Sequence, residues 1–131
     1  MQHNDNNSLE QPGELAIREL AMPADTNPNG EIFGGWIISQ MDLAGLSIAG
    51  RHTRDKIVTI AIDRMKFIAP VHVGDFICCY VALDHFGNTS ITLKITTIAV
   101  NANGQNRRKV TEGLFTYVSV GADGKPTPLM K

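Results

Sequence analysis

Alternation of hydrophobic and polar positions predicts several long β-strands along the chain. Ile91, Leu93 and Ile95, for example, fall on one face, because side chains two apart in a strand point the same way. Gly-Asn and Asn-Gly dipeptides separate the last three runs and supply the positive backbone angles that hairpins need. The strands predicted in this way are Ile57–Ile62, Phe76–Phe86, Ser90–Val100 and Lys109–Val120.

A further strand is predicted near the start of the chain, at Leu15–Leu20. Its apolar residues alternate moderately well, and Pro23 ends it because proline cannot donate to a β-ladder. Residues 1–13 are mostly Asn, Gln, Asp, Pro and Gly with one Leu, which predicts a flexible leader. A single domain is therefore expected over residues 14–128.

One long segment, Trp36–Ala49, fits a helix better than a strand. At 100° per residue its apolar side chains cover nearly the whole circumference, and turn-forming residues fill positions 24–30 before it. A helix that is apolar on all sides must be surrounded by other structure. We therefore expect an α+β fold in which a long curved antiparallel sheet wraps around one central helix. A second copy of the chain should complete the burial.

Composition narrows the class of protein. The chain has 131 residues, 43% of them hydrophobic, and a net charge of -1, which suits one compact domain and argues against a polybasic nucleic-acid binder. No apolar run of about 18 residues could span a bilayer, and the polar start lacks a secretory signal pattern. Cys78 and Cys79 are adjacent in a predicted strand, so they face opposite sides and cannot form a disulfide. We expect a cytoplasmic protein with no nucleic-acid or membrane partner.

Asp42 is the first candidate for a catalytic residue. It is the only charged residue between Gly34 and Gly50, and it falls at the margin of the apolar face of the predicted helix. A carboxylate there loses part of its hydration. It therefore needs a hydrogen-bond or ion-pair partner, a bound ligand or a catalytic role. It is therefore a candidate general base or nucleophile. The alternative is an interface aspartate that only accepts a hydrogen bond from a neighbouring backbone N–H.

Two features before the helix could accompany Asp42. Gly34 and Gly35 stand immediately before the predicted helix, where a substrate can approach the backbone and the first-turn N–H groups can act as an oxyanion hole. The plainer interpretation is a close turn between strand and helix. Asn27, in the preceding loop, can hold a water or a carbonyl oxygen through its amide, although Asn beside Pro is more often a turn former.

Half of the basic residues lie in two short segments. Three of the 12 occur in 51–56 and three in 107–109. Such clusters can bind the phosphates of an anionic ligand. More often, however, a run of charged residues simply forms a solvated surface. The candidates for phosphate contact are Arg51, Arg54, Arg107 and Arg108.

Other catalytic patterns are excluded. The segment 45–49 superficially matches a nucleophile elbow, but it lies within the predicted helix instead of at a strand-to-helix turn. There is no phosphate-binding loop, HExxH or CxxC motif, and the four histidines are too scattered to suggest a metal site. Cys78 and Cys79 are better explained by core packing than as nucleophiles. No metal or cofactor is expected.

Four blocks of sequence, taken together, are highly specific: Leu20–Asn27, Gly30–Asp42, Phe67–Asp75 and Lys109–Val118. They resemble the bacterial broad-specificity acyl-CoA thioesterases of the hotdog superfamily, and the match runs from about Leu15 to Pro128. The resemblance implies hydrolysis of acyl-CoA to free CoA and a carboxylic acid, without metal or bound cofactor. It also implies sites at the interface of hotdog dimers, which often associate into trimers of dimers.

Carried over residue by residue, the resemblance assigns roles to three positions. Asp42 matches the catalytic aspartate of the helix, and Asn27 matches a catalytic asparagine that acts from the opposing protomer. Gly35 matches the residue whose N–H polarises the thioester carbonyl. The chain departs from the family pattern in a more basic linker at 50–56 and a shorter hairpin around 103–106, both candidates to line the nucleotide end of CoA.

Two other functions remain open from the sequence. A hotdog hydratase acting on enoyl-thioesters usually needs an Asp–His pair, and no His follows Asp42 within two helical turns. An acyl-CoA-binding sensor would be non-catalytic, and such proteins usually append a DNA-binding module, which this chain lacks.

Overall fold

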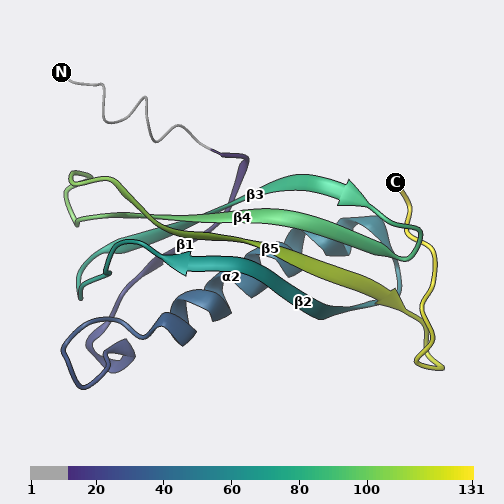
Figure 1. Ribbon diagram of the computed structural model, residues 1–131, viewed down its shortest axis with the longest axis horizontal. Coiled ribbons are helices and arrows are strands. Elements are labelled where there is room, and N and C mark those ends of the chain that lie inside the picture. Colours follow the sequence, from purple (N-terminus) through teal and green to yellow (C-terminus); the bar gives the residue numbers. More distant parts are fainter. Residues whose placement is uncertain (1–11) are drawn as a thin grey trace.

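A computed structural model describes residues 12–131 (Figure 1). Five strands form one antiparallel sheet in the order β1-β3-β4-β5-β2, and one long helix lies across a face of that sheet (Figure 1). This is the architecture expected from the sequence. The elements are β1 Glu14–Leu20, the 3-10 turn η1 Pro23–Asp25, α2 Gly34–Ala49, the 3-10 turn η2 Gly50–His52, β2 Lys56–Phe67, β3 Phe76–Phe86, β4 Ser90–Val100 and β5 Arg108–Val120.

The predicted limits of β3 and β4 are confirmed, whereas β2 continues five residues beyond its predicted end at Ile62. Two irregularities explain the difference. The pairing of β2 with β5 shifts register between Thr59 and Ala61 and again between Asp63 and Lys66, and Arg64 has a φ of 60°. Bulges of this kind break the period-two alternation while the strand itself continues.

The helix begins at Gly34, two residues earlier than predicted. Glycine is a poor helix former, so the two glycines looked like part of the preceding turn. The N–H of Ile37 nevertheless donates to the carbonyl of Phe33, 3.3 Å away, which closes the first turn. Gly34 and Gly35 therefore belong to α2, and their N–H groups are among those that a helix start leaves unpaired.

The helix has a buried face and an exposed face. Ile37, Met41 and Ala44 are at most 2% exposed against the sheet. On the opposite side Leu43 is 53% exposed and Leu46 37%. One sheet therefore covers only one side of a helix that is apolar nearly all round, as the sequence indicated.

The two cysteines are free and buried. Cys79 packs in the main core between helix and sheet, whereas Cys78 packs with Tyr80 and Ile98 in a separate cluster. Their predicted orientation toward opposite faces is confirmed. No helix within residues 12–131 has the length and apolar character needed to cross a membrane. The predicted leader at 1–13 lies, for residues 1–11, outside the described part of the chain.

Candidate active site

Asp42 is held by two hydroxyl groups from neighbouring strands. Thr59 on β2 donates to Oδ1 at 2.8 Å, and Tyr117 on β5 lies 3.1 Å from the same oxygen and 3.0 Å from the Asp42 carbonyl. Thr59 and Tyr117 are direct cross-strand partners, so they face the helix side by side. The register of β2 against β5 therefore determines the position of the carboxylate.

Oδ2 is the oxygen of Asp42 that the protomer leaves available. Among the residues described, both side-chain hydrogen bonds to the carboxylate end on Oδ1. The side chain is half-buried on the margin of the exposed helix face. A carboxylate with one fixed oxygen and one available oxygen is suited to proton abstraction or nucleophilic attack.

Tyr117 acts as a donor toward Asp42. Its side chain is fully buried, and burial, reinforced by the negative charge of Asp42, raises the pKa of the phenol well above its ordinary value. The hydroxyl therefore keeps its proton at every physiological pH. Sequence reasoning missed both Thr59 and Tyr117, and the only signal was a hydroxyl-bearing residue at a core-facing position of each strand.

Asn27 is fixed in the loop that precedes the helix. Its Oδ1 accepts hydrogen bonds from the backbone N–H groups of Asn29 at 2.9 Å and Glu31 at 3.1 Å, and its own N–H donates to the Glu31 carbonyl. This is the turn-forming role expected of an Asn in that position. The anchored oxygen leaves the NH₂ group as the part of the side chain that can meet a ligand.

Gly34 and Gly35 form the start of α2 beside a pocket. The Gly35 N–H has no acceptor in the described part of the chain, and a Cβ added there would have no neighbour within 4 Å. A Cβ at Gly34 would lie 3.3 Å from the ring of Phe67. A pocket of about 450 Å³ opens here, lined by Gly34, Ile37, segment 67–71 and the loop residues Glu31 and Ile32. An available N–H at a helix start next to a pocket can bind a carbonyl oxygen or an anion.

One protomer does not bring these groups together. Gly35 and Asp42 are seven residues apart on the same helix, which corresponds to about 10 Å along its axis. Seven residues are close to two full turns, so both side-chain positions share one face. The loop of Asn27 lies at the Gly35 end, because Phe33 donates to the carbonyl of Asp25 and Thr26 pairs with Ile32.

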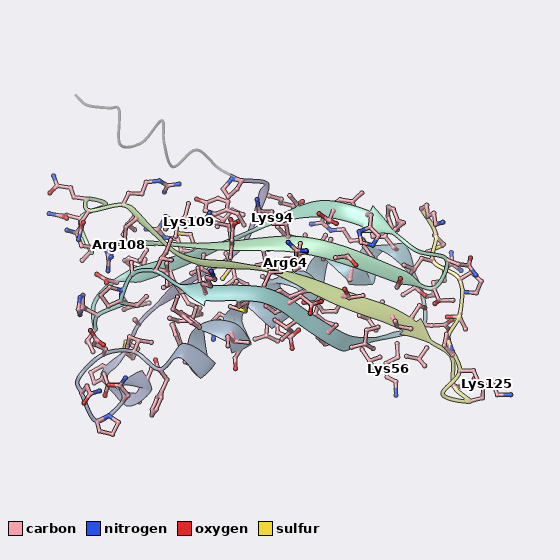
Figure 2. All side chains as sticks on the ribbon, in the orientation of Figure 1. Lys56, Arg64, Lys94, Arg108, Lys109 and Lys125 are labelled. Carbon is pink, nitrogen blue, oxygen red and sulfur yellow. The ribbon has the colours of Figure 1, made fainter. Side chains whose placement is uncertain are left out.

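The two basic clusters lie at opposite ends of β5. Lys56 pairs with Val120 at one end, and Arg108 begins the strand at the other, which separates them by about 40 Å. Figure 2 shows Lys56 and Arg108 toward opposite ends of the sheet. Within one protomer the segments 50–56 and 103–109 therefore cannot line the same end of one ligand.

The four arginines differ in their surroundings. Arg51 forms a bidentate ion pair with Glu14, and its hydrogen bond lowers the pKa of that carboxyl. Arg54 is exposed and has no partner in the described part of the chain. The Arg107 guanidinium lies 5.9 Å from the centre of the Tyr80 ring.

Arg108 is largely enclosed by neighbouring residues. Its guanidinium pairs with Asp75 at 2.5 Å, and the two side chains are only 18% and 9% exposed. It also donates to the carbonyls of Pro70 and Asn106. Asp75 in turn accepts from the N–H of His72. Arg108 thus ties the segment that lines the pocket to the start of β5.

In the described part of the chain, the cysteines and the possible metal ligands form no competing site. Burial raises the pKa of the Cys79 thiol to about 11, so little reactive thiolate exists at neutral pH. No three His, Cys, Asp or Glu side chains between residues 12 and 131 are grouped so that they could hold a metal ion.

Comparison with known proteins agrees with this architecture. The family model described as the Thioesterase superfamily matches residues 29–101. The acyl-CoA thioester hydrolase YciA of Salmonella typhimurium is 50% identical over 121 residues, which are 89% of this chain and 90% of that protein. The hexameric thioesterase y2039 of Yersinia pestis is 45% identical with a TM-score of 0.87, covering 93% of this chain and 99% of that one. Cj0915 of Campylobacter jejuni, a hexameric hotdog fold thioesterase, is 46% identical with a TM-score of 0.81. The match covers 89% of this chain and 90% of that one.

An antiparallel sheet of five strands laid across one central helix is the hotdog fold, which this chain shares with Cj0915. Fold alone assigns no reaction. The family match covers more than half of the chain, and the identity to YciA spans most of both sequences. The chain therefore belongs to the thioesterase superfamily, and the resemblance seen in the sequence is confirmed.

Proposed function

We propose that this protein hydrolyses acyl-CoA thioesters to free CoA and a carboxylic acid. The observation that carries this proposal is the 50% identity, over nearly the whole chain, to a protein named as an acyl-CoA thioester hydrolase. The hydratase and the non-catalytic sensor gain no support from these relatives. The geometry around Asp42 agrees with hydrolysis, because a fixed carboxylate with an available oxygen suits the activation of water.

Asp42 is the proposed catalytic carboxylate. As a general base it takes a proton from water while the hydroxide attacks the thioester carbonyl, and collapse of the tetrahedral intermediate releases the CoA thiolate, which is then protonated. As a nucleophile it attacks the carbonyl itself, releases the thiolate and forms a mixed anhydride that water cleaves. Both routes begin from the ionised carboxylate and give the same products.

Gly35 is the proposed oxyanion donor. Its N–H has no acceptor in the described protomer and lies at the positive end of the α2 dipole, so it can stabilise the charge that develops on the thioester oxygen. One such donor contributes about 3–4 kcal/mol to transition-state stabilisation in comparable sites. Gly34 lines the adjoining pocket, and the absence of a side chain at Gly35 leaves open space beside this N–H. Asn27 would present its NH₂ group to the carbonyl oxygen or to water, since its Oδ1 is anchored in the loop.

We propose that a second copy completes the site. Gly35, Ser39 and Asp42 share the exposed face of α2, and Ser39 lies midway between the other two along the helix. A two-fold axis near Ser39 would place two antiparallel helices so that Asp42 of one copy meets Gly35 and Asn27 of the other. Exposed Leu43 and Leu46, on the same helix, would be covered by this packing.

The edge of the sheet also favours a second copy. β2 is the last strand in the sheet and pairs only with β5 in the described protomer. It carries Ile60 and Ile62, which are 59% and 41% exposed. An unpaired 12-residue edge with exposed isoleucines is suited to pairing with another strand. A dimer, and a trimer of such dimers, is the proposed assembly, in agreement with hexameric relatives.

The phosphates of CoA are the proposed ligands of the arginines. Because the two clusters are about 40 Å apart in one protomer, both can contact one CoA only if they come from different copies. Arg51 and Arg108 are already paired with the carboxylates of Glu14 and Asp75. Each of these arginines would have to divide its hydrogen bonds between that carboxylate and a phosphate. Arg54, which is exposed, is the more accessible candidate in this respect.

The test is release of free thiol from acetyl-, butyryl- and long-chain acyl-CoA, by the wild type and by Asp42→Asn. We expect hydrolysis by the wild type and a fall in turnover of about 100-fold or more in Asp42→Asn. Asp84→Asn, at an exposed aspartate of β3, is the matched control and should keep wild-type turnover. Absence of hydrolysis by the wild type would refute the proposed reaction. Normal turnover in a folded Asp42→Asn variant would remove Asp42 from it.

A further inference from the structure

We propose that Tyr117 is a positioning residue for the reaction: its hydroxyl holds Oδ1 of Asp42, so that Oδ2 faces water or the thioester. This inference rests on the proposed catalytic role of Asp42. It adds a residue of β5 to which the sequence alone assigned no role in the site.

The contacts at Asp42 support this assignment. The Tyr117 oxygen is 3.1 Å from Oδ1 and Thr59 Oγ1 is 2.8 Å from the same atom. Two donors converging on one carboxylate oxygen restrict rotation of the carboxylate and leave the lone pairs of Oδ2 available. In the described protomer Thr59 lies exposed on the edge strand β2, whereas Tyr117 is fully buried on the interior strand β5. Tyr117 is therefore the rigid member of the pair.

The hydroxyl of Tyr117 has one proton and two acceptors within reach. Besides Oδ1 it lies 3.0 Å from the backbone carbonyl of Asp42. The carbonyl already belongs to the helix, and a hydrogen bond to a carboxylate is the stronger of the two. Since burial raises the pKa of the phenol well above its ordinary value, the hydroxyl keeps its proton at physiological pH and can donate it to Asp42.

Gly45 explains how a helix can lie close enough for this contact. A Cβ at Gly45 would overlap the Tyr117 hydroxyl and would lie 2.7 Å from both Tyr117 Cζ and Ile95 Cδ1. Real Cβ atoms do not approach that closely, so glycine is required for the present helix-to-sheet distance. Asp42 and Gly45 are three residues apart, on adjacent turns, and Tyr117 sits against both.

The experiment is Tyr117→Phe with Tyr80→Phe as its matched control. The chain has two tyrosines; Tyr80 is 3% exposed but packs in the other cluster, away from Asp42. We expect Tyr117→Phe to lower kcat about 10- to 100-fold while KM changes by less than about twofold, because orientation of the carboxylate is lost and the binding surface is kept. Tyr80→Phe should keep kcat. A folded Tyr117→Phe variant with kcat within about twofold of the wild type overturns the proposal.

Gly45→Ala is a second variant that perturbs the Tyr117 hydroxyl, in this case from the helix. It provides an independent test if Tyr117→Phe folds poorly. The added methyl should displace the hydroxyl and lower kcat about 10-fold, and it should add little to the loss in a folded Tyr117→Phe background. Full additivity of the two losses in kcat would contradict a shared mechanism.

Asp42→Asn is assayed in parallel. If this variant keeps full turnover, the proposed function of Asp42 fails and this inference with it. If Asp42→Asn is inactive and Tyr117→Phe is normal, only the positioning role fails.

Discussion

Arg107 and Arg108 are neighbours in sequence with different surroundings. Arg108 is enclosed by Asp75 and by the carbonyls of Pro70 and Asn106, whereas Arg107 stacks over the ring of Tyr80 near the end of the sheet. An enclosed ion pair is costly to break, because removal of one partner leaves the other as an uncompensated charge. The two residues should therefore respond differently to the same substitution.

Arg108→Ala should lower the free energy of unfolding by about 3 kcal/mol, because Asp75 loses its partner inside the fold. Arg107→Ala should raise KM for acyl-CoA several-fold with little change in kcat, because the phosphates are remote from the thioester. Urea unfolding and steady-state kinetics on both variants measure these effects.

An acyl-pantetheine substrate, which lacks the nucleotide phosphates, is the control for this pair. The KM effect of Arg107→Ala should disappear on that substrate. If Arg107→Ala changes KM equally for both substrates, the arginine does not contact phosphates. If Arg108→Ala is as stable as the wild type, the enclosed pair contributes nothing to folding.

At the residue scale, the sequence singled out Asp42 because a lone charge on an apolar helix needs an explanation. It could not identify Thr59 or Tyr117. Their contact with Asp42 depends on the register of β2 against β5 and on the close approach of the helix at Gly45. Both features depend on residues far apart in the sequence, so the local hydrophobic pattern cannot predict them.

At the scale of elements, α2 has two functional faces. The face with Ile37 and Met41 anchors the helix to the sheet, while the opposite face carries exposed Leu43 and Leu46 beside the candidate groups Gly35 and Asp42. Apolar residues on an exposed helix face next to an unpaired sheet edge are typical of an interface. The element that holds the site together inside the protomer is thus also the one expected to contact the second copy.

The elements differ in how well their ends could be predicted. β3 and β4 lie inside the sheet and bury alternating residues over most of their length, such as Ile77, Cys79 and Val81, so their limits followed from the pattern. β2 is an edge strand with two register shifts, and bulges conceal the alternation that marks a strand. The start of α2 was hidden by glycines whose helical conformation depends on the contact between Phe33 and Ile37.

Leu43→Glu should disrupt assembly, because it places a carboxylate in the proposed helix-to-helix contact. The matched control is Leu83→Glu on β3, since Leu43 and Leu83 are equally exposed, at 53% and 55%, but lie on different elements. Sedimentation at micromolar concentration should show smaller species and low turnover for Leu43→Glu only. Unchanged assembly in Leu43→Glu would show that the exposed face of α2 is not the interface.

At the scale of the whole molecule, the proposed site is divided between two copies. The proposed base and the proposed oxyanion donor are about 10 Å apart along one helix, so neither can act on the same carbonyl as the other without a second copy. The sequence indicated a partner because one sheet cannot surround an apolar helix. The proposed position of the two-fold axis, near Ser39, could not be inferred in that way, since it depends on which side of the helix the sheet covers.

Subunit mixing tests the divided site directly. Asp42→Asn and Asn27→Ala should each be nearly inactive alone, but a mixed dimer contains one site with both residues intact if the residues come from opposite copies. Random pairing of equal amounts makes half of the dimers mixed, each with one intact site of two, so about a quarter of wild-type activity should return. The variants are mixed by co-refolding from urea, and thiol release is measured before and after.

The reciprocal mixture distinguishes this result from simple recovery of folded protein. When the wild type is mixed with the double variant Asp42→Asn/Asn27→Ala, a divided site leaves activity only in wild-type dimers, about a quarter of the fully wild-type value. Sites contained within one copy would instead keep about half in this mixture and would recover nothing in the first. The divided site therefore predicts equal activity in the two mixtures, an outcome that neither refolding efficiency nor a self-contained protomer produces.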